Sequence, residues 1–562
     1  MNIVDGGVPE DVEFADLAAR TVVALLELDP VEATALGDHR WDDRLGDGSA
    51  AGYAAAGQLV AEALEAIDQV DDDVLTVGTA IDLETLRTRL AGIELGLSVI
   101  GEHRWNPLHA NPGSALHLLL ARDFAPLPDR LHSLAGRLAA VPVALADSRA
   151  VLEEMPRVHV ETAIAQFEGT AHLIEQQVAL ELDSAPLLRR EVEPAASAAM
   201  AAVKDHVDWL RSRVEESTRD PRLGEQKYAA KLWHTLDAEL APDQLLERAE
   251  SDLVRIEGEI ARAAAQYLGV SPPPPDDAGD VVRRALAAVA ADGSVSDESV
   301  VAQCVAALAR TTDFVREHDH VTIHDDNVEI IVMPEIHRGV SVAYCDPPGP
   351  LETLALPTFF AVSPTPIDWS SERVSSFYRE YNSHMLHNLT VHEAMPGHVL
   401  QLAHSRRGAS PTLVRQAFWS GPFVEGWAVY AEELMAARGY SSNGNDSGAL
   451  AVRLQQLKMQ LRTTINTILD VRVHSRGMTE AEGMRLMQQR GHQEEGEAVG
   501  KWRRALLTST QLSTYYVGYV AVRDLAADLG SAYPEWSDRE LHDAMLAHGS
   551  PSPRHLRTLL LG

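Results

Sequence analysis

The chain has 562 residues, which is enough for a large buried core and for roughly three to four domains of ordinary size. Its 83 acidic residues outnumber its 48 Lys and Arg residues, which gives a formal charge of −35 at pH 7. Such a surface repels phosphate backbones and anionic membranes, so we expect neither nucleic-acid binding nor membrane binding. The hydrophobic fraction of 45% and the charged fraction of 23% are ordinary for a soluble globular protein.

The cysteines and the N-terminal residues predict a cytoplasmic location. Cys304 and Cys345 are the only cysteines, which is too few for a disulfide framework, so we expect buried thiols in a reducing compartment. The first residues lack a basic start and an apolar run, which predicts that no signal peptide is present. No apolar stretch of about 20 residues occurs, so no membrane span is predicted.

Most of the first half of the chain has the pattern of amphipathic helices. Apolar residues recur at helical spacing in four segments, at 14–26, 131–151, 196–214 and 241–268. Four consecutive prolines at 272–275 cannot lie inside a helix and stiffen the chain. We therefore predict a helical lobe over 1–270 and a second lobe over 271–562, with the two lobes forming one compact unit.

The pattern changes between about residue 318 and residue 362. Short β-branched segments, separated by Asp, Asn, Pro and Gly, occur at 321–323, 328–332, 340–344 and 358–362. They predict a small antiparallel sheet within a mainly α-helical protein. Helical periodicity returns at Ser371 and continues to the C-terminus.

The sharpest chemical pattern is His392-Glu393-Ala394-Met395-Pro396-Gly397-His398. Neutral imidazoles bind Zn²⁺ well, and a glutamate beside the first histidine is placed to take a proton from an activated water. The preceding residues have helical periodicity, so His392 and Glu393 are expected late on a helix. The sequence thus predicts that His392 and His398 are metal ligands and that Glu393 is the general base.

The spacing of the two histidines differs from the common His-Glu-x-x-His pattern. At i and i+6 on a straight helix they lie about 120° apart and about 9 Å apart along the axis, too far for one metal ion. Pro396 removes a helical hydrogen bond, and Gly397 permits unusual backbone angles. We therefore predict a local break that brings His398 back. The alternative is two unrelated histidines at a helix end.

A third protein ligand is expected downstream, in the segment Phe423 to Leu434. Glu425 stands in an apolar run, where a carboxylate is costly unless it is paired or ligated, and we favour ligation over a buried salt bridge. Glu432 lies seven residues later on nearly the same face. It either holds a ligand histidine through the second ring nitrogen or is a solvated residue.

These residues resemble a known family. His392 to His398 with Pro396-Gly397, followed by Glu425-Gly426-Trp427-Ala428, is similar to the bacterial family called domain of unknown function 885. That family in turn resembles the helical gluzincin metallopeptidases, which include the angiotensin-converting-enzyme and Taq-carboxypeptidase groups. The resemblance implies a two-lobed helical fold, with the small sheet beside the metal helix and a deep central cleft.

The resemblance also implies roles for residues outside the metal motif. In helical gluzincins a histidine and a tyrosine from downstream helices donate to the oxyanion, and His474 and Tyr515 match these positions. An edge strand beside the metal helix binds the peptide, and the segment 358–362 is the candidate, with a packed hairpin as the alternative. Tyr344, Phe360 and Arg523 are the residues that the resemblance assigns to substrate binding.

Together these patterns predict zinc-dependent hydrolysis of peptide bonds in short peptides. One Zn²⁺ per chain is expected on His392, His398 and Glu425, although Mn²⁺ or Co²⁺ suits the same ligands. Two alternatives remain open: a metal-dependent hydrolase of another amide or an ester, and a non-catalytic helical binding protein. The sequence does not decide between a monomer and a homodimer.

Overall fold

The computed structural model describes residues 8–334, 342–366, 369–408 and 412–562. By their internal contacts these residues form two compact units. The first unit contains the chain up to Pro221 together with Pro348–Leu356 and Thr412–Phe418, and the second contains the rest. The contacts thus divide the chain after Pro221 rather than at residue 270, and the proline-rich segment lies inside the second unit, between two of its helices.

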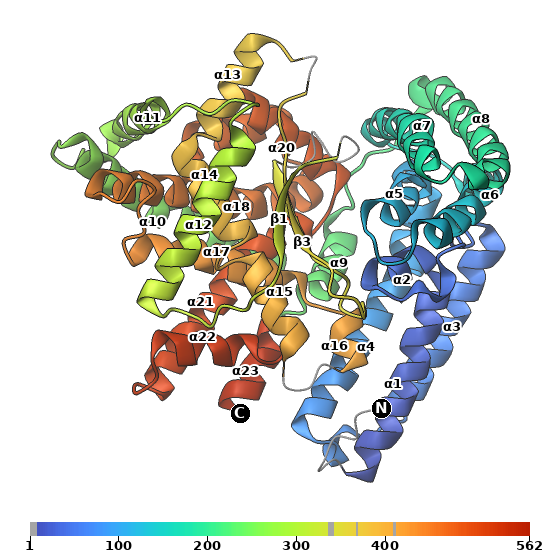
Figure 1. Cartoon of the computed structure of the whole chain (residues 1–562). Helices are drawn as coiled ribbons and strands as arrows, with labels where there is room; N and C mark the ends of the chain where they lie inside the picture. The colour runs from blue at the N-terminus through green and yellow to red at the C-terminus, as the bar shows by residue number, and fades with distance from the viewer. Residues whose placement is uncertain (1–7, 335–341, 367–368, 409–411) are drawn as a thin grey trace. The chain divides into compact units, whose positions relative to one another are not determined.

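The first unit is helical (Figure 1). Its helices are α1 (Pro9–Leu28), α2 (Pro30–Leu36), α3 (Ala50–Asp68), α4 (Val77–Leu95), α5 (Gly113–Ala121), α6 (Leu127–Val151), α7 (Arg157–Ser184), α8 (Arg189–Arg213) and α16 (Leu413–Ala417). Although α16 comes from late in the chain, Val414 and Ala417 share a core with Phe14 of α1. A buried ion pair of 2.6 Å between Arg415 and Asp82 also ties α16 to α4.

The second unit contains the remaining helices and a small sheet (Figure 1). Its helices are α9 (Glu225–Leu236), α10 (Pro242–Leu268), α11 (Pro275–Asp292), α12 (Val300–His318), α13 (Ser371–Glu380), α14 (Ser383–Glu393), α15 (His398–Arg407), α17 (Gly421–Ala437), α18 (Asp446–Arg476), α19 (Glu480–Arg485), α20 (Glu495–Leu507), α21 (Thr514–Ala532), α22 (Asp538–Leu546) and α23 (Pro553–Leu561). The prediction of a mainly helical protein is therefore confirmed.

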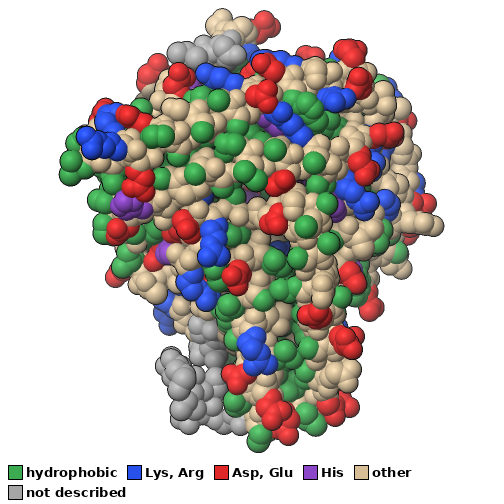
Figure 2. Space-filling model, turned by 90° about the vertical axis from the view of Figure 1, so that its right-hand side faces the viewer, with side chains coloured by type: hydrophobic (Ala, Val, Ile, Leu, Met, Phe, Trp, Pro, Cys, Tyr) green, Lys and Arg blue, Asp and Glu red, His purple; other side chains and the backbone are tan. Residues whose placement is uncertain are grey.

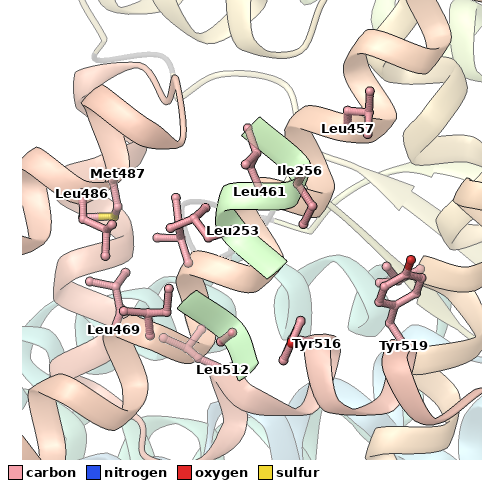
Figure 3. Packing of buried hydrophobic residues seen from close by; sticks show 14 of the residues in the cluster. Leu253, Ile256, Leu457, Leu461, Leu469, Leu486, Met487, Leu512, Tyr516 and Tyr519 are labelled. Carbon is pink, nitrogen blue, oxygen red and sulfur yellow. The ribbon is translucent and has the colours of Figure 1, made fainter. Parts of the chain in front are cut away.

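Helix α18 lies at the centre of the second unit. It packs against α9, α10, α14, α17, α20 and α21, and Figure 3 shows Leu253 and Ile256 of α10 close to Leu461 of α18. Because α18 is buried on all sides, its polar side chains need partners within the protein. Two examples are short hydrogen bonds: Lys458 donates to the Glu380 carboxylate at 2.8 Å, and Gln460 donates to the Tyr519 hydroxyl at 2.5 Å.

The small sheet is mixed, so the prediction of an antiparallel sheet was wrong for one of its two pairings. Strands β1 (Val328–Val332), β2 (Ala343–Asp346) and β3 (Thr358–Val362) are arranged in the order β1-β3-β2. The chain reverses after each strand, so the first and third strands run in the same direction. Since β3 is inserted between the other two, it pairs in parallel with β1 and antiparallel with β2.

Two of the four predicted strand segments differ in the structure. The segment 321–323 is not part of the sheet, because the Thr322 backbone N–H and hydroxyl both donate to the Asp543 carboxylate on α22. That bonding replaces a strand ladder with a side-chain partner. The segment 340–344 corresponds to β2, and its first two residues lie outside the described part of the chain.

Helices α17 and α21 cross in direct backbone contact. A methyl group built on Gly426 would lie 2.3 Å from the backbone of Gly518, and one built on Gly518 would lie 1.8 Å from the Pro422 carbonyl oxygen. No side chain fits at these distances, so both positions require glycine. This crossing fixes the direction of the helix that carries Glu425.

Charged side chains of both signs are interspersed on the face of the molecule shown in Figure 2. Among the described helices, none combines the length and apolar character needed to cross a membrane.

We expect Gly518→Ala to lower the free energy of unfolding by about 3 kcal/mol, because the added methyl group must push α17 and α21 apart. Urea unfolding followed by circular dichroism measures this change. Gly530→Ala on the same helix is the matched control, since its methyl group would meet only an ordinary contact at 3.8 Å. Equal unfolding midpoints for the two variants would contradict the close crossing.

Candidate metal centre

The His-Glu motif is divided between two helices. Helix α14 ends at Glu393, the next residue leaves the helical region, and α15 begins at His398. The break between them folds the chain back on itself so closely that a methyl group on Gly397 would lie 1.8 Å from the carbonyl oxygen of His392. The predicted distortion is therefore confirmed: a full helix break, with glycine at its closest approach, allows His398 to return toward His392.

The break is held by α17. The indole Nε1–H of Trp427 donates to the carbonyl oxygen of Pro396 at 2.8 Å, and the Trp427 side chain is fully buried. Trp427 follows Glu425 by two residues, so the helix that supplies the third predicted ligand also fixes the turn before His398. The sequence alone did not indicate this role for Trp427, because a tryptophan in an apolar run is usually a core residue.

The structure brings His392, His398 and Glu425 together, and one ligand atom from each lies within 4.8 Å of the others. The Nε2 atoms of His392 and His398 are 3.5 Å and 3.6 Å from the same Oε2 atom of Glu425. Ligand atoms about 2.1 Å from a tetrahedral zinc ion lie about 3.4 Å apart, so these separations fit the edges of a zinc coordination tetrahedron. Glu425 Oε2 is buried and has no hydrogen-bond partner among the described residues, as expected of an atom that binds a cation.

A second carboxylate orients the first histidine. His392 Nδ1–H donates to Glu432 Oε1 at 2.7 Å, and the Asn388 amide donates to Glu432 Oε2 at 2.6 Å. This contact fixes the orientation of the His392 ring, so that Nε2 faces Glu425. The structure thus places Glu432 behind a ligand, which decides between the two readings of its sequence position. Asn388 was missed, although it lies one helical turn before His392.

The electrostatics of the cluster reflect the shared burial of its members. Burial disfavours a charged imidazole, but the Glu425 and Glu432 carboxylates outweigh it and raise the pKa of His392 well above its usual value. Burial also disfavours a charged carboxylate, yet the two imidazoles hold the pKa of Glu425 far below its usual value. The cluster therefore keeps a carboxylate ionised in a buried site, which is the condition for binding a divalent cation.

Glu393 lies beside the three candidate ligands. Its side chain is buried, and burial raises the pKa of this carboxyl group despite the nearby imidazoles of His392 and His398. The backbone N–H of Cys345 on strand β2 donates to the same carboxylate. Strand β2 therefore lies next to the end of α14, and the prediction that the sheet lies beside the metal helix holds for this strand.

Tyr515 also lies near the cluster. It is on the first turn of α21, one turn before Gly518, the residue that contacts Gly426. Burial and the neighbouring Glu425 charge raise the pKa of Tyr515, which keeps its hydroxyl protonated and able to donate. The Arg504 guanidinium donates to the Tyr515 oxygen at 3.5 Å.

His474 lies in a different network. Its Nε2–H is shared between the carbonyl oxygens of Ala505 and Thr508, both at 2.9 Å, and its ring stacks on Tyr228. Asp470 lies one helical turn before His474. Burial lowers the pKa of His474, and the Asp470 charge opposes that effect. The structure therefore gives His474 contacts with the helix core and none with the three ligands.

The three predicted substrate-binding residues have different environments. Phe360 is fully buried in the central strand β3 and packs on α14 and α15, so its ring is core and β3 is not an edge strand. Tyr344 is half-buried on β2, next to the residue that contacts Glu393. Arg523 bonds to Asp524 and Tyr519 on its own helix. Tyr344 precedes Cys345 on β2 and Phe360 is the partner of Cys345 on β3, so two of the three are adjacent to the residue that contacts Glu393.

Comparison with known proteins identifies the family. Residues 30–560 match the family model described as "Bacterial protein of unknown function (DUF885)". Because this match covers nearly the whole chain, the chain belongs to that bacterial family, and the resemblance seen in the motifs is confirmed. No curated protein matches the sequence significantly.

Two solved structures share the fold over nearly their full length. A "putative lipoprotein of unknown function" from Shewanella oneidensis is 28% identical, with a TM-score of 0.81 over 98% of this chain and 100% of that one. A "putative lipoprotein" from Colwellia psychrerythraea is 15% identical, with a TM-score of 0.78 over 98% of each chain. The second likeness shows the fold alone.

We expect purified protein dialysed against zinc to hold about one zinc ion per chain, as measured by elemental analysis. Glu425→Gln removes an anionic ligand atom and should lose the metal, and Glu432→Gln should weaken zinc binding about 10- to 100-fold by releasing the orientation of His392. The control is His318→Ala, which alters an exposed histidine at the end of α12. Equal zinc content in wild type and Glu425→Gln would rule out this site.

Proposed function

Taking membership of this bacterial family as the premise, we propose that the protein is a zinc-dependent peptidase that hydrolyses short peptides. The observation that carries the proposal is the convergence of His392, His398 and Glu425 beside the buried carboxylate of Glu393. Two imidazoles and one carboxylate are the usual protein ligands of catalytic zinc, which keeps a fourth position for water or substrate. The same ligands accept Mn²⁺ or Co²⁺.

The helical gluzincin fold is part of this proposal. In that group two histidines near a helix end and a glutamate on a later helix form the site, and here α14, α15 and α17 supply the equivalent residues. The two additional residues in the motif are accommodated by the helix break at Gly397. The ligand set is therefore compatible with gluzincin chemistry in spite of the altered spacing.

Each residue beside the metal ligands has a defined task in the proposed reaction. Bound zinc would supply Lewis acidity, polarising the scissile carbonyl and lowering the pKa of water. Glu393 accepts the proton of the attacking water and delivers it to the leaving amine nitrogen. The Tyr515 hydroxyl donates to the oxygen on which negative charge develops. His474 and Phe360 receive no task, because their side chains are committed to the core.

The buried position of Glu393 favours catalysis over simple binding. A buried carboxylate that is not a ligand costs free energy, and a binding module gains nothing from it. Hydrolysis of another amide or an ester by the same groups follows the same chemistry, and substrate screening separates these cases. The cytoplasmic location remains a prediction, and the two structural relatives named as lipoproteins make an envelope location a second hypothesis.

We expect Glu393→Gln to reduce peptide hydrolysis about 10²- to 10⁴-fold, because the amide cannot accept the proton of the attacking water. Zinc content should stay at the wild-type level, since Glu393 is not among the three converging ligands. Initial rates with a fluorogenic peptide library, measured alongside zinc content, test this. Wild-type rates in a fully zinc-loaded variant would overturn the assignment of the base.

We expect Tyr515→Phe to lower kcat about 10²- to 10³-fold with little change in KM, because the lost donor acts mainly in the transition state. Tyr516→Phe is the matched control, since its hydroxyl donates instead to Asp252 at 2.7 Å. Steady-state kinetics of both variants on one peptide give the comparison. A loss of the same size in Tyr516→Phe would show that the effect is structural.

A further inference from the structure

One face of helix α20 carries a row of charged residues. Glu497, Lys501 and Arg504 occupy positions i, i+4 and i+7, so their side chains leave the same side of the helix. Over seven residues the row spans about 10 Å along the helix axis. Its two ends differ in their partners, and that difference shows what the row can bind.

The acidic end of the row is already neutralised. The Glu497 carboxylate accepts hydrogen bonds from the Arg462 guanidinium and the Tyr381 hydroxyl. The adjacent carboxylate of Glu380 is paired with the Lys458 ammonium group at 2.8 Å, and this pair is buried. Both carboxylates are therefore hydrogen-bonded to other groups, and the Glu497 charge acts on Lys501 only as a further, unbonded neighbour.

The basic end of the row has no hydrogen-bonded carboxylate partner among the described residues. Lys501 is only 6% exposed, and its ammonium group makes no hydrogen bond or ion pair with the residues that the structure describes. Arg504 donates to neutral acceptors, the Gln511 amide oxygen at 2.8 Å and the Tyr515 hydroxyl at 3.5 Å. Burial and the charges of Arg462 and Arg504 lower the pKa of Lys501 well below its usual value.

Two adjacent cations that lack a hydrogen-bonded counterion raise the free energy of the folded state in a partly dehydrated site. Each loses hydration, and each repels the other, so the arrangement destabilises the fold unless an anion completes it. The chain as a whole has a large excess of acidic residues, so a carboxylate partner would have been easy to supply. The absence of a hydrogen-bonded carboxylate among the described residues indicates a site for an external anion.

This basic end lies beside the candidate metal centre. Arg504 contacts the hydroxyl of Tyr515, and the charge of Glu425 acts on that same phenol. Tyr515 in turn is one helical turn from Gly518, which touches the backbone of Gly426 next to Glu425. Tyr515 therefore connects Glu425 of the candidate metal centre with Arg504 of the basic end.

We propose that Lys501 and Arg504 form a subsite for a carboxylate of the peptide substrate. The proposal rests on the proposed function, because it is the metal centre beside the two cations that makes the anion part of a substrate. Residues of an extended peptide are about 3.5 Å apart, so the carboxylate must belong to a residue close to the cleaved bond. Its source is either the free C-terminus, as in an exopeptidase, or a neighbouring Asp or Glu side chain.

Three short peptides separate these sources. They are N-acetyl-trialanine with a free C-terminal carboxylate, the same peptide as a C-terminal amide, and N-acetyl-Ala-Asp-Ala as an amide. The zinc-loaded wild type should cleave the free acid with a kcat/KM about 10- to 100-fold above that of the plain amide, the range expected for charged hydrogen bonds. A higher kcat/KM for the Asp-containing amide than for the free acid would assign the subsite to a side-chain carboxylate.

The variants test the two cations directly. Lys501→Met and Arg504→Gln should each lower the ratio of kcat/KM for the free acid to kcat/KM for the plain amide. This ratio cancels any effect on both peptides, such as one transmitted through the contact of Arg504 with Tyr515. Arg503→Gln alters the neighbouring exposed arginine on another side of α20 and is the matched control, which should keep the preference. Melting temperatures confirm folding, and Arg504→Gln alone decides the result if Lys501→Met does not fold.

Calorimetric titration of the same peptides into zinc-free protein gives a readout that does not depend on catalysis. Tighter binding of the free acid or Asp peptide than of the plain amide, lost in Lys501→Met, supports the subsite even where no peptide is hydrolysed; only the proposed peptidase function then fails. Hydrolysis with equal treatment of all three peptides, in binding and in rate, overturns the subsite and leaves the peptidase standing. Equal or absent binding without hydrolysis overturns both.

Discussion

The geometry of the α-helix is the constraint on which the site depends. Two histidines six residues apart on one helix point in different directions and cannot share an ion, so the chain must leave the helix between them. It does so directly after Glu393, and the return is so tight that only glycine fits at position 397. This break puts the last turn of α14 and the first turn of α15 on opposite sides of one point, where His392 and His398 meet.

Helix α17 then organises the centre from more than one of its faces. Glu425 supplies the third candidate ligand atom, Trp427 holds the helix break through Pro396, and Glu432 orients His392. Because these three groups are fixed to one another by the helix, an error in the position of α17 would affect all of them together. The glycine contact with α21 prevents such an error, since it leaves no room for the helices to slide. The same glycine contact therefore stabilises the core and fixes the positions of the site residues on α17.

The sequence contains much of this site because its chemistry is local. Imidazoles beside a glutamate, and a carboxylate in an apolar run, are unusual enough to identify His392, His398 and Glu425 without a structure. The helix break was predictable from Pro396-Gly397 for the same reason. Strand order was not, because parallel pairing of β1 with β3 depends on the third strand entering between the first two. His474 could not be assigned from the sequence. Its position on α18 fits a catalytic donor, but its ring donates to backbone carbonyl oxygens.

The carboxyl groups around the candidate metal centre explain why cations on α20 would be needed to bind an anionic substrate group. Glu425, Glu432 and Glu393 place three carboxyl groups around a site whose ion would bring two positive charges, within a chain of net charge −35. A substrate carboxylate entering this region meets repulsion from the centre and from the surface. An anionic group can bind there only where cations are held close to the metal and shielded from water. Lys501 and Arg504 meet both conditions, because one is buried and the other contacts Tyr515. Under the proposed function, the metal centre alone would favour uncharged peptides, and the row on α20 would shift that preference toward peptides with a carboxylate next to the bond that is cut.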